Sequence, residues 1–256
     1  MTAAPRTILV AISGPSCSGK TTLARHLRTA LAPDAIIVHE DDFFLSDAAV
    51  PVVAAADGRQ LHDWDCLEAV DVAGFEAALR AVKATGRWPD GLVSQEDQNT
   101  MGPVPVDEAA IAAKAEELRD AVAAAAAAGG ERVRLAIVEG FLLYAEGMKN
   151  VRDLFDVRIL LAADYHTVKA RREARKGYVT LEGYWEDPPG YVDAIVWPNY
   201  VKYHGMLYAD GDVSKGFDEA KCKQLGIDAV PDASSHDMTA CFAWAVDRIA
   251  GKLKQS

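Results

Sequence analysis

Three carboxylates in a row follow an apolar run near the N-terminus, in the sequence VHEDDFFL at residues 38–45. Neighbouring carboxylates repel one another, so Glu40, Asp41 and Asp42 need either a cation or a structural reason to stand together. One interpretation is a polar turn in which an aspartate caps a short helix. The other is a catalytic carboxylate beside a metal ion and a phosphate.

A glycine-rich loop precedes these acids. The sequence GPSCSGKT at 14–21 fits the Walker A pattern, with an apolar run before it and a helical pattern after it. Its glycines allow a tight curl that points backbone N–H groups at a phosphate, and the helix N-terminus adds its positive end. Lys20 would neutralise the β- and γ-phosphates, and the Thr21 hydroxyl would bind Mg²⁺. The predicted ATP-binding residues are Gly14, Ser16, Ser18, Gly19, Lys20, Thr21 and Thr22. The alternative is a glycine-rich turn with an accidental lysine.

A further acid ends another apolar run, in LAIVEG at 135–140. An acid at the end of a buried strand resembles the Walker B arrangement, in which Glu139 would hold Mg²⁺ through water and Gly140 would allow a close backbone approach. Many strands end in an acid, so this pattern gains its meaning only from the Walker A sequence beside it.

Strands and helices alternate along most of the chain. Continuous apolar runs predict buried strands at 7–13, 34–39, 133–140 and 156–163, and a last short strand at 227–231. Helical spacing predicts helices at 20–31, 67–85, 107–130, 165–176 and 236–254. This order indicates an α/β fold with a parallel β-sheet flanked by helices on both faces. Since such sheets bind ligands beyond the carboxyl ends of their strands, the loop 14–21, Asp41, Asp42 and Glu139 should meet at one edge.

Composition limits the classes of partner. The 256 residues are half apolar, enough for one large domain spanning 1–256. The net charge of −11 argues against a nucleic-acid binder, which needs a basic stripe. The four cysteines show no metal-binding spacing and fit free thiols in a reducing compartment. No run is apolar and long enough to span a bilayer, and we expect a cytoplasmic protein, with the nucleus as the alternative.

Five segments together resemble the nicotinamide riboside kinases, a family of P-loop nucleoside kinases related to uridine kinase. They are GPSCSGKTTLA, HEDDFF, DCLEA, VEGFLLY and PPGYVDAIVWPNYVKY. The resemblance runs in order from about residue 7 to 204, and segments near 86–130 and 205–236 read as insertions. It implies a P-loop nucleoside kinase fold with a helical lid. It also implies ATP and Mg²⁺ as cofactors, and phosphorylation of the 5′-hydroxyl of nicotinamide riboside, with nicotinic acid riboside as a second candidate substrate.

The resemblance also implies roles for four residues. Asp41 would be the base that takes the proton of the ribose 5′-hydroxyl, although the residues alone do not choose between Asp41 and Asp42. Asp65 would bind the ribose hydroxyls, while Trp64 and Tyr191 would sandwich the pyridine ring. Family members typically carry tyrosine where this chain has Trp64. A pyridinium cation between two aromatic faces is a cation–π arrangement. Asp65 also begins the sequence DCLE, which fits a capping box for the helix 67–85.

A basic helix, HTVKARREARK at 166–176, follows the predicted strand 156–163. Arg171 and Arg175 share one face at a spacing of four residues. They would act as lid arginines that stabilise the transferring phosphoryl group. The alternative is a solvated charged surface, which is how most charge runs are used.

Two other functions fit parts of the pattern. A uridine or cytidine kinase would use the same chemistry with a different base pocket. A nucleotide-hydrolysing switch or assembly ATPase would share the Walker A loop, although the N-K-x-D motif of GTPases is absent from the sequence. We expect a small-molecule riboside and a nucleoside triphosphate as partners, no nucleic acid or membrane, and a monomer or homodimer.

Overall fold

The computed structural model describes residues 5–92, 94, 104–175, 177–180 and 183–255. Its strands are β1 Arg6–Ser13, β2 Ala35–His39, β3 Val52–Ala54, β4 Gln60–His62, β5 Val133–Glu139, β6 Val157–Leu160, β7 Tyr178–Thr180, β8 Gly183–Trp185 and β9 Asp228–Ala229. Its α-helices are α1 Lys20–Leu31, α2 Val72–Thr85, α3 Glu108–Gly129, α4 Lys149–Arg152, α5 Tyr165–Glu173, α6 Trp197–His204, α7 Glu219–Leu225, α8 Asp232–Ser235 and α9 Met238–Leu253.

Five parallel strands form the central sheet, in the order β2-β5-β1-β6-β9. The register sets Ile12 of β1 and His39 of β2 on either side of Glu139, the last residue of β5. Three neighbouring strands therefore end at the same level, and the loops that follow them leave from one edge. The parallel α/β sheet predicted from the sequence is confirmed.

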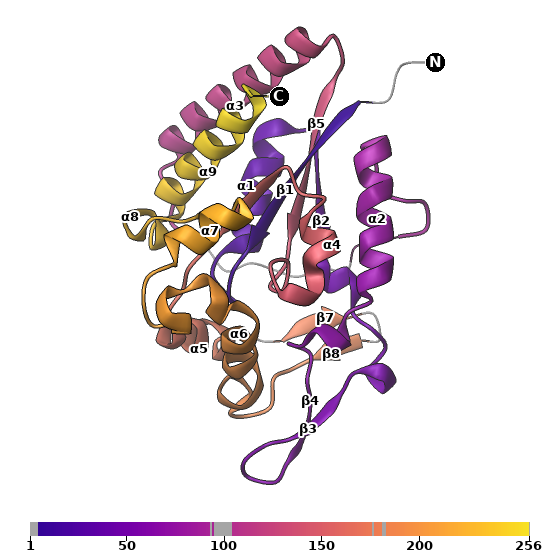
Figure 1. The fold of residues 1–256 in the computed structure, drawn as a ribbon, viewed down its shortest axis with the longest axis vertical. Helices are drawn as coiled ribbons and strands as arrows, with labels where there is room; N and C mark the ends of the chain where they lie inside the picture. Colours follow the sequence, from indigo (N-terminus) through magenta and orange to yellow (C-terminus); the bar gives the residue numbers. More distant parts are fainter. Residues whose placement is uncertain (1–4, 93, 95–103, 176, 181–182, 256) are drawn as a thin grey trace.

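Alternating residues of the strands pack on two opposite helical layers, because successive side chains of a strand point to opposite faces. Ile8, Val10 and Ile12 join the cluster formed with α1, α3 and α9. Leu9 and Ala11 join the cluster formed with α2 and the segment around α4. Figure 1 shows α1, α3 and α9 on one side of the sheet and α2 and α4 on the other. These layers fix the sheet edge from both sides.

Helix α2 begins five residues later than the sequence predicts. A short 3₁₀ turn, Leu67–Ala69, comes first, and α2 starts after Asp71, whose carboxylate accepts a hydrogen bond of 2.9 Å from the Gly74 N–H. The structure therefore excludes the alternative in which Asp65 caps this helix. The side chain of Asp65 is buried and lies against Arg172, far away in the sequence.

The two segments that read as insertions contribute to the layers of the fold. Helix α3 lies within 86–130 and packs against α1 and α9. Strand β9 lies within 205–236 and pairs with β6 at the edge of the sheet. Most of SQEDQNTMGPVPV at 94–106, for which the sequence offers no function, lies outside the described residues.

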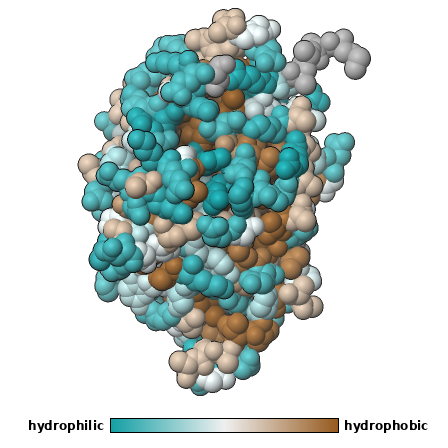
Figure 2. Space-filling view, in the orientation of Figure 1, coloured by the Kyte–Doolittle hydropathy of each residue, from teal (hydrophilic) through white to brown (hydrophobic). Residues whose placement is uncertain are grey.

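Two short antiparallel pairs, β3-β4 and β7-β8, extend beyond the sheet edge. Each carries an exposed apolar side chain, Val52 in β3 and Tyr184 in β8. Figure 2 shows hydrophobic residues gathered toward the lower part of the molecule, where Figure 1 places these strands. In the part of the chain that the structure describes, no helix has the length and apolar character needed to cross a membrane.

The cap of α2 gives a test of this fold. Asp71→Ala should lower the free energy of unfolding by about 1 kcal/mol, because the Gly74 N–H at the first turn loses its acceptor. Urea denaturation followed by circular dichroism measures the change. Asp71→Asn keeps an acceptor and should recover most of the loss. Equal losses in both variants would contradict the assignment of Asp71 as the cap.

Candidate active site

The loop between β1 and α1 has the backbone geometry of a phosphate cradle. Gly14, Cys17 and Gly19 all have positive φ angles, of 147°, 59° and 97°. A side chain at Gly14 would place its Cβ 2.6 Å from the Leu161 carbonyl oxygen, so only glycine fits beside that strand end. The buried Lys20 ammonium donates to the Pro15 carbonyl oxygen at 3.0 Å, which holds it across the loop. The loop thus presents N–H groups and a cation to one concavity.

Glu139 connects this loop to the end of β2. The Thr21 hydroxyl donates to Glu139 Oε1 at 3.0 Å, and His39 Nδ1 lies 2.7 Å from the same oxygen. Burial opposes ionisation of Glu139, but the hydrogen bond and charge of His39 outweigh it and, with the Lys20 charge, lower the pKa below its usual value. Glu139 is therefore an anionic group at the foot of the phosphate loop.

Thr21 and Glu139 suit a magnesium ion. Mg²⁺ prefers oxygen ligands, and in phosphate-transfer sites it takes one or two from the protein and the rest from phosphate and water. A hydroxyl and a carboxylate in contact at the phosphate loop supply such a pair. Among the described residues there is no cluster of three or more metal-ligating side chains, so a site made entirely by those residues is not formed.

The three acids of the sequence HEDDFF have different surroundings. Glu40 has no exposed surface, and its Oε2 accepts a hydrogen bond of 3.0 Å from the Leu142 N–H. Its carboxyl lies against Gly140, where an added Cβ would come within 2.1 Å of Oε2. Glu40 therefore ties the segment after β2 to the segment after β5, and it requires glycine at position 140.

The charge state of Glu40 follows from this position. Burial raises its pKa from 4.5 to about 7, against the smaller opposing effects of the Leu142 N–H and the Lys20 ammonium. Asp41 and Asp42 are half-exposed on the 3₁₀ turn Glu40–Phe43 that follows β2. The strand-end alignment thus places them at the predicted edge. The choice between them as base stays a prediction.

Arg172 of α5 is the charged centre on the opposite side of the site. Its guanidinium makes a bidentate pair with Asp65, at 3.1 and 3.2 Å, and contacts Asp187 at 2.7 and 3.3 Å. It also donates to the Ser16 hydroxyl of the phosphate loop at 3.1 Å. Burial raises the pKa of Asp65, although Arg172 opposes the shift. Arg172 therefore joins the phosphate loop to the residue predicted to bind ribose.

Of the two arginines predicted from the sequence, Arg171 lies on α5, whereas Arg175 lies beyond it, because the helix ends at Glu173 and not at 176 as predicted. Arg171 donates to the Cys17 carbonyl oxygen of the phosphate loop at 3.0 Å, while Arg175 is exposed in the turn after α5. Lys169 forms a 2.6 Å ion pair with Asp193, which also accepts a hydrogen bond from Tyr165. Asp193, which the sequence leaves without a role, therefore fastens α5 to the π-helix Val192–Val196.

The aromatic residues differ in arrangement from the predicted sandwich. The ring centroid of Trp185 lies 5.9 Å from that of Trp64 and 5.8 Å from that of Tyr191. Tyr191 is only 1% exposed, and the Arg172 guanidinium lies over its ring at 5.6 Å. Its hydroxyl donates to the His62 carbonyl at 2.8 Å and accepts from the Trp64 N–H at 3.1 Å. In this structure Tyr191 positions the segment that carries Trp64 and has no open face.

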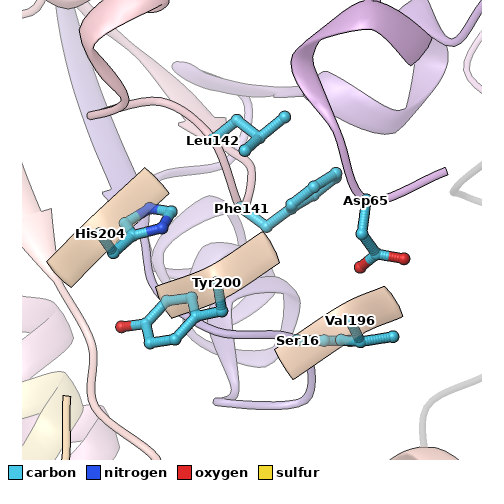
Figure 3. Close-up of a pocket in the computed structure, with 7 residues that line it drawn as sticks. All are labelled: Ser16, Asp65, Phe141, Leu142, Val196, Tyr200 and His204. Carbon is cyan, nitrogen blue, oxygen red and sulfur yellow. The ribbon is translucent and has the colours of Figure 1, made fainter. Parts of the chain in front are cut away.

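A narrow pocket lies between the phosphate loop and α6 (Figure 3). It is lined by Ser16, Asp65, Phe141, Leu142, Val196, Tyr200 and His204. Segments that follow β1 and β5 thus share one concavity with Asp65 and with α6. Of the groups predicted to meet at this edge, the phosphate loop lines the pocket through Ser16, whereas Asp41, Asp42 and Glu139 are not among the lining residues.

Sequence reasoning missed several of these groups. His39 and Glu40 were adjacent to the predicted site, but no local pattern separated them from ordinary strand-end residues. Arg172 was present in the basic helix, yet its partners Asp65 and Asp187 are distant in sequence or unpatterned. Trp185 lies in a stretch without periodicity. If Asp65 is buried in a ligand site, its carboxylate needs a nearby cation, and this requirement is the signal that could have pointed to Arg172.

No family model matches the chain. Known nicotinamide riboside kinases do match it. The Schizosaccharomyces pombe protein is 38% identical over 209 residues, which cover 82% of this chain and 84% of that protein. The Saccharomyces cerevisiae protein is 34% identical over 224 residues, which cover 86% of this chain and 87% of that protein. Human nicotinamide riboside kinase 2 is 31% identical over 80% of this chain and 70% of that protein.

Glu40 should make stability depend on pH. The folded protein holds this proton more tightly than the unfolded chain, because the folded pKa of about 7 exceeds the usual 4.5. The contribution of protonated Glu40 to the free energy of unfolding is therefore fully present below pH 4.5 and is lost as the pH rises through about 7. The total change is about 3 kcal/mol. Glu40→Gln does not titrate, so its stability relative to wild type should rise over this range.

Urea denaturation at several pH values between 4.5 and 8 measures that difference. Glu116→Gln, at an exposed position on α3, is the matched control for the loss of a carboxyl. A stability difference between Glu40→Gln and wild type that stays constant with pH would contradict the assignment.

Removing Arg172 should expose the cost of the buried carboxylates. Arg172→Leu leaves Asp65 without its cation and should lower the free energy of unfolding by about 3 kcal/mol or more. Adding Asp65→Asn should recover part of that loss, because the unpaired charge is then gone. Arg171→Leu, on the neighbouring exposed position, should cost less than about 1 kcal/mol. Additive effects of Arg172→Leu and Asp65→Asn would show that the two residues are not coupled.

Proposed function

Since the chain belongs to the nicotinamide riboside kinase family, we propose that it transfers the γ-phosphate of ATP to the 5′-hydroxyl of nicotinamide riboside, giving the mononucleotide. The single observation that carries the proposal is the contact of Arg172 with both the phosphate loop and Asp65. This contact sets a nucleotide subsite beside a subsite for a polar acceptor, as phosphoryl transfer requires.

The donor is held by the loop and its helix. N–H groups of the loop and the N-terminus of α1 bind the β- and γ-phosphates, and Lys20 compensates their charge. Thr21 would hold Mg²⁺, with Glu139 as a second ligand acting directly or through water. When bound, the ion neutralises charge on the transferring group. Arg171, whose guanidinium donates to the Cys17 carbonyl oxygen of the loop, would stabilise the transferring phosphoryl group together with Arg175 in the turn after α5.

Asp41 supplies the base. Its carboxylate is half-exposed, next to Glu40, whose carboxyl is close enough to Lys20 for the ammonium to affect its pKa. From that position Asp41 accepts the proton of the 5′-hydroxyl as the phosphoryl group leaves ATP. In the loose transition state of phosphoryl transfer the bond to the attacking hydroxyl is barely formed, so the main task of Asp41 is to orient that hydroxyl. Asp42, one residue along the same turn, is the alternative base.

Asp65 and Arg172 bind the ribose. Each carboxylate oxygen of Asp65 already accepts one hydrogen bond from Arg172 and retains a further lone pair for a sugar hydroxyl. Because the pair fixes the orientation of the carboxylate, the acceptor meets a preorganised partner.

The pyridinium ring would contact Trp64 and Trp185. These rings lie next to each other in the structure, and tryptophan gives the strongest cation–π attraction, about 0.5–2 kcal/mol per face. Tyr191, whose hydroxyl holds the backbone at residues 62 and 64, would support this ring pair from behind rather than stack on the substrate. This revises the sandwich of Trp64 and Tyr191 expected from the sequence.

Turnover of ribosides tests the proposal. The purified protein with ATP and Mg²⁺ should convert nicotinamide riboside to its mononucleotide with one ADP per product, and should favour it over uridine. Asp41→Asn should lower kcat by about 10²- to 10⁴-fold, because the hydroxyl loses its proton acceptor. Product analysis by mass spectrometry and coupled ADP detection measure both.

Asp42→Asn is the matched control and should change kcat only a few-fold. The reverse order of the two variants would assign the base to Asp42. Phosphate release without any phosphorylated riboside would instead indicate a nucleotide-hydrolysing switch, and preferred turnover of uridine would indicate a pyrimidine nucleoside kinase.

A further inference from the structure

The imidazole of His204 has no role in the proposed reaction, yet it lies inside the candidate site. His204 ends α6, has no exposed surface, and stacks on Tyr200 with ring centroids 4.6 Å apart and an angle of 18°. Neither ring nitrogen has a hydrogen-bond partner of good geometry. A buried polar group left in this state costs stability, and such groups in native proteins call for an explanation.

The ring faces a place where a ligand can reach it. His204 lines the same narrow pocket as Ser16 of the phosphate loop and Asp65. Figure 3 shows the imidazole at one end of this pocket and the Asp65 carboxyl at the other. Phe141, Leu142 and Val196 form apolar walls between them. A ligand that contacts Asp65 can therefore extend toward His204.

The charge state of the ring limits what it can bind. Burial lowers the pKa of His204 to about 3. The nearby Tyr200 backbone opposes this shift, and the charge of Lys20 adds a smaller lowering effect. At neutral pH the ring is uncharged and offers one donor and one acceptor. An anionic phosphate would prefer a cation, and a pyridinium would prefer an aromatic face or a carboxylate. An alcohol, which donates one hydrogen bond and accepts others, is the complementary group.

We propose that His204 hydrogen-bonds one of the 2′- and 3′-hydroxyls of the acceptor ribose, at the end of the pocket opposite Asp65, and so selects ribosides over deoxyribosides. This inference rests on the proposed function, because it identifies the acceptor as a sugar. It adds a specificity-determining residue on α6 to the acceptor subsite. The substrate hydroxyl then supplies the hydrogen-bond partner that the His204 ring lacks in the free protein.

His204→Phe tests the role, because phenylalanine keeps the ring and its stacking on Tyr200 but removes both nitrogens. The KM for the riboside should rise roughly three- to tenfold, the effect of one neutral hydrogen bond, while the KM for ATP stays unchanged. The Tm of the free protein should stay the same or increase. His204→Gln, which keeps a donor and an acceptor, should show a smaller rise in KM. An unchanged KM for the riboside in His204→Phe would overturn the proposal.

Tyr208→Phe separates binding from packing. Tyr208 shares a 2.6 Å hydrogen bond with the Tyr200 hydroxyl but does not line the pocket. This variant should lower Tm and leave the KM for the riboside unchanged. Equal increases in KM in both variants would show that the effect of His204 is only on packing, and would overturn the proposal.

Deoxyribosides identify the hydroxyl. In wild type, removal of the hydroxyl that His204 binds should raise KM, and in His204→Phe the same removal should raise KM by a smaller factor, because only a contact with Asp65 is then left to lose. If the effect of His204→Phe on KM is additive with the loss of the 2′-hydroxyl and also with the loss of the 3′-hydroxyl, the role of His204 is overturned. The proposed function would not be affected by that result, because the wild-type protein would still phosphorylate ribosides. A wild-type protein that phosphorylates no riboside would refute the proposed function and this inference together.

Discussion

The register of three parallel strands is the constraint on which the site depends. β5 lies between β1 and β2, and Glu139 at its end is level with Ile12 and His39. The Glu139 carboxylate can therefore contact both Thr21, in the first turn of α1, and His39, the last residue of β2. A shift of one residue in either pairing would turn Glu139 to the opposite face, since side chains alternate along a strand. The phosphate loop and the end of β2 would then no longer be joined through Glu139.

Buried charge shapes the rest of the site. Asp65 and Glu40 are both removed from water, and the structure compensates them differently. Asp65 is paired with the Arg172 guanidinium, which also contacts Asp187 and the phosphate loop. A network of charged hydrogen bonds therefore compensates the burial of the Asp65 carboxylate. Glu40 has backbone N–H groups rather than a paired cation beside it, and burial drives it toward its neutral form. A carboxylate held by Arg172 can accept hydrogen bonds from a ligand, whereas a protonated Glu40 acts as a structural link between two strand ends.

The sequence predicts those parts whose causes are local. The bounds of α1 agree with the spacing of its leucines, and the four longer strands follow from continuous apolar runs. The capping alternative for Asp65 failed for the opposite reason. The spacing D-x-x-E at 65–68 fits a capping box, but the Asp65 carboxylate instead pairs with Arg172, which lies 107 positions away in the sequence. The same reason explains why Arg172 and Trp185 escaped notice: their partners come together only when α5 and the β7-β8 pair fold against the sheet edge.

Helix α5 contacts both halves of the site through adjacent residues. Arg171 binds the Cys17 carbonyl of the nucleotide loop, and Arg172 binds Asp65 on the acceptor side. Any displacement of this short helix by one ligand must also move the groups that receive the other. Binding free energies linked in this way are reciprocal, so each ligand must change the affinity for its companion by the same factor.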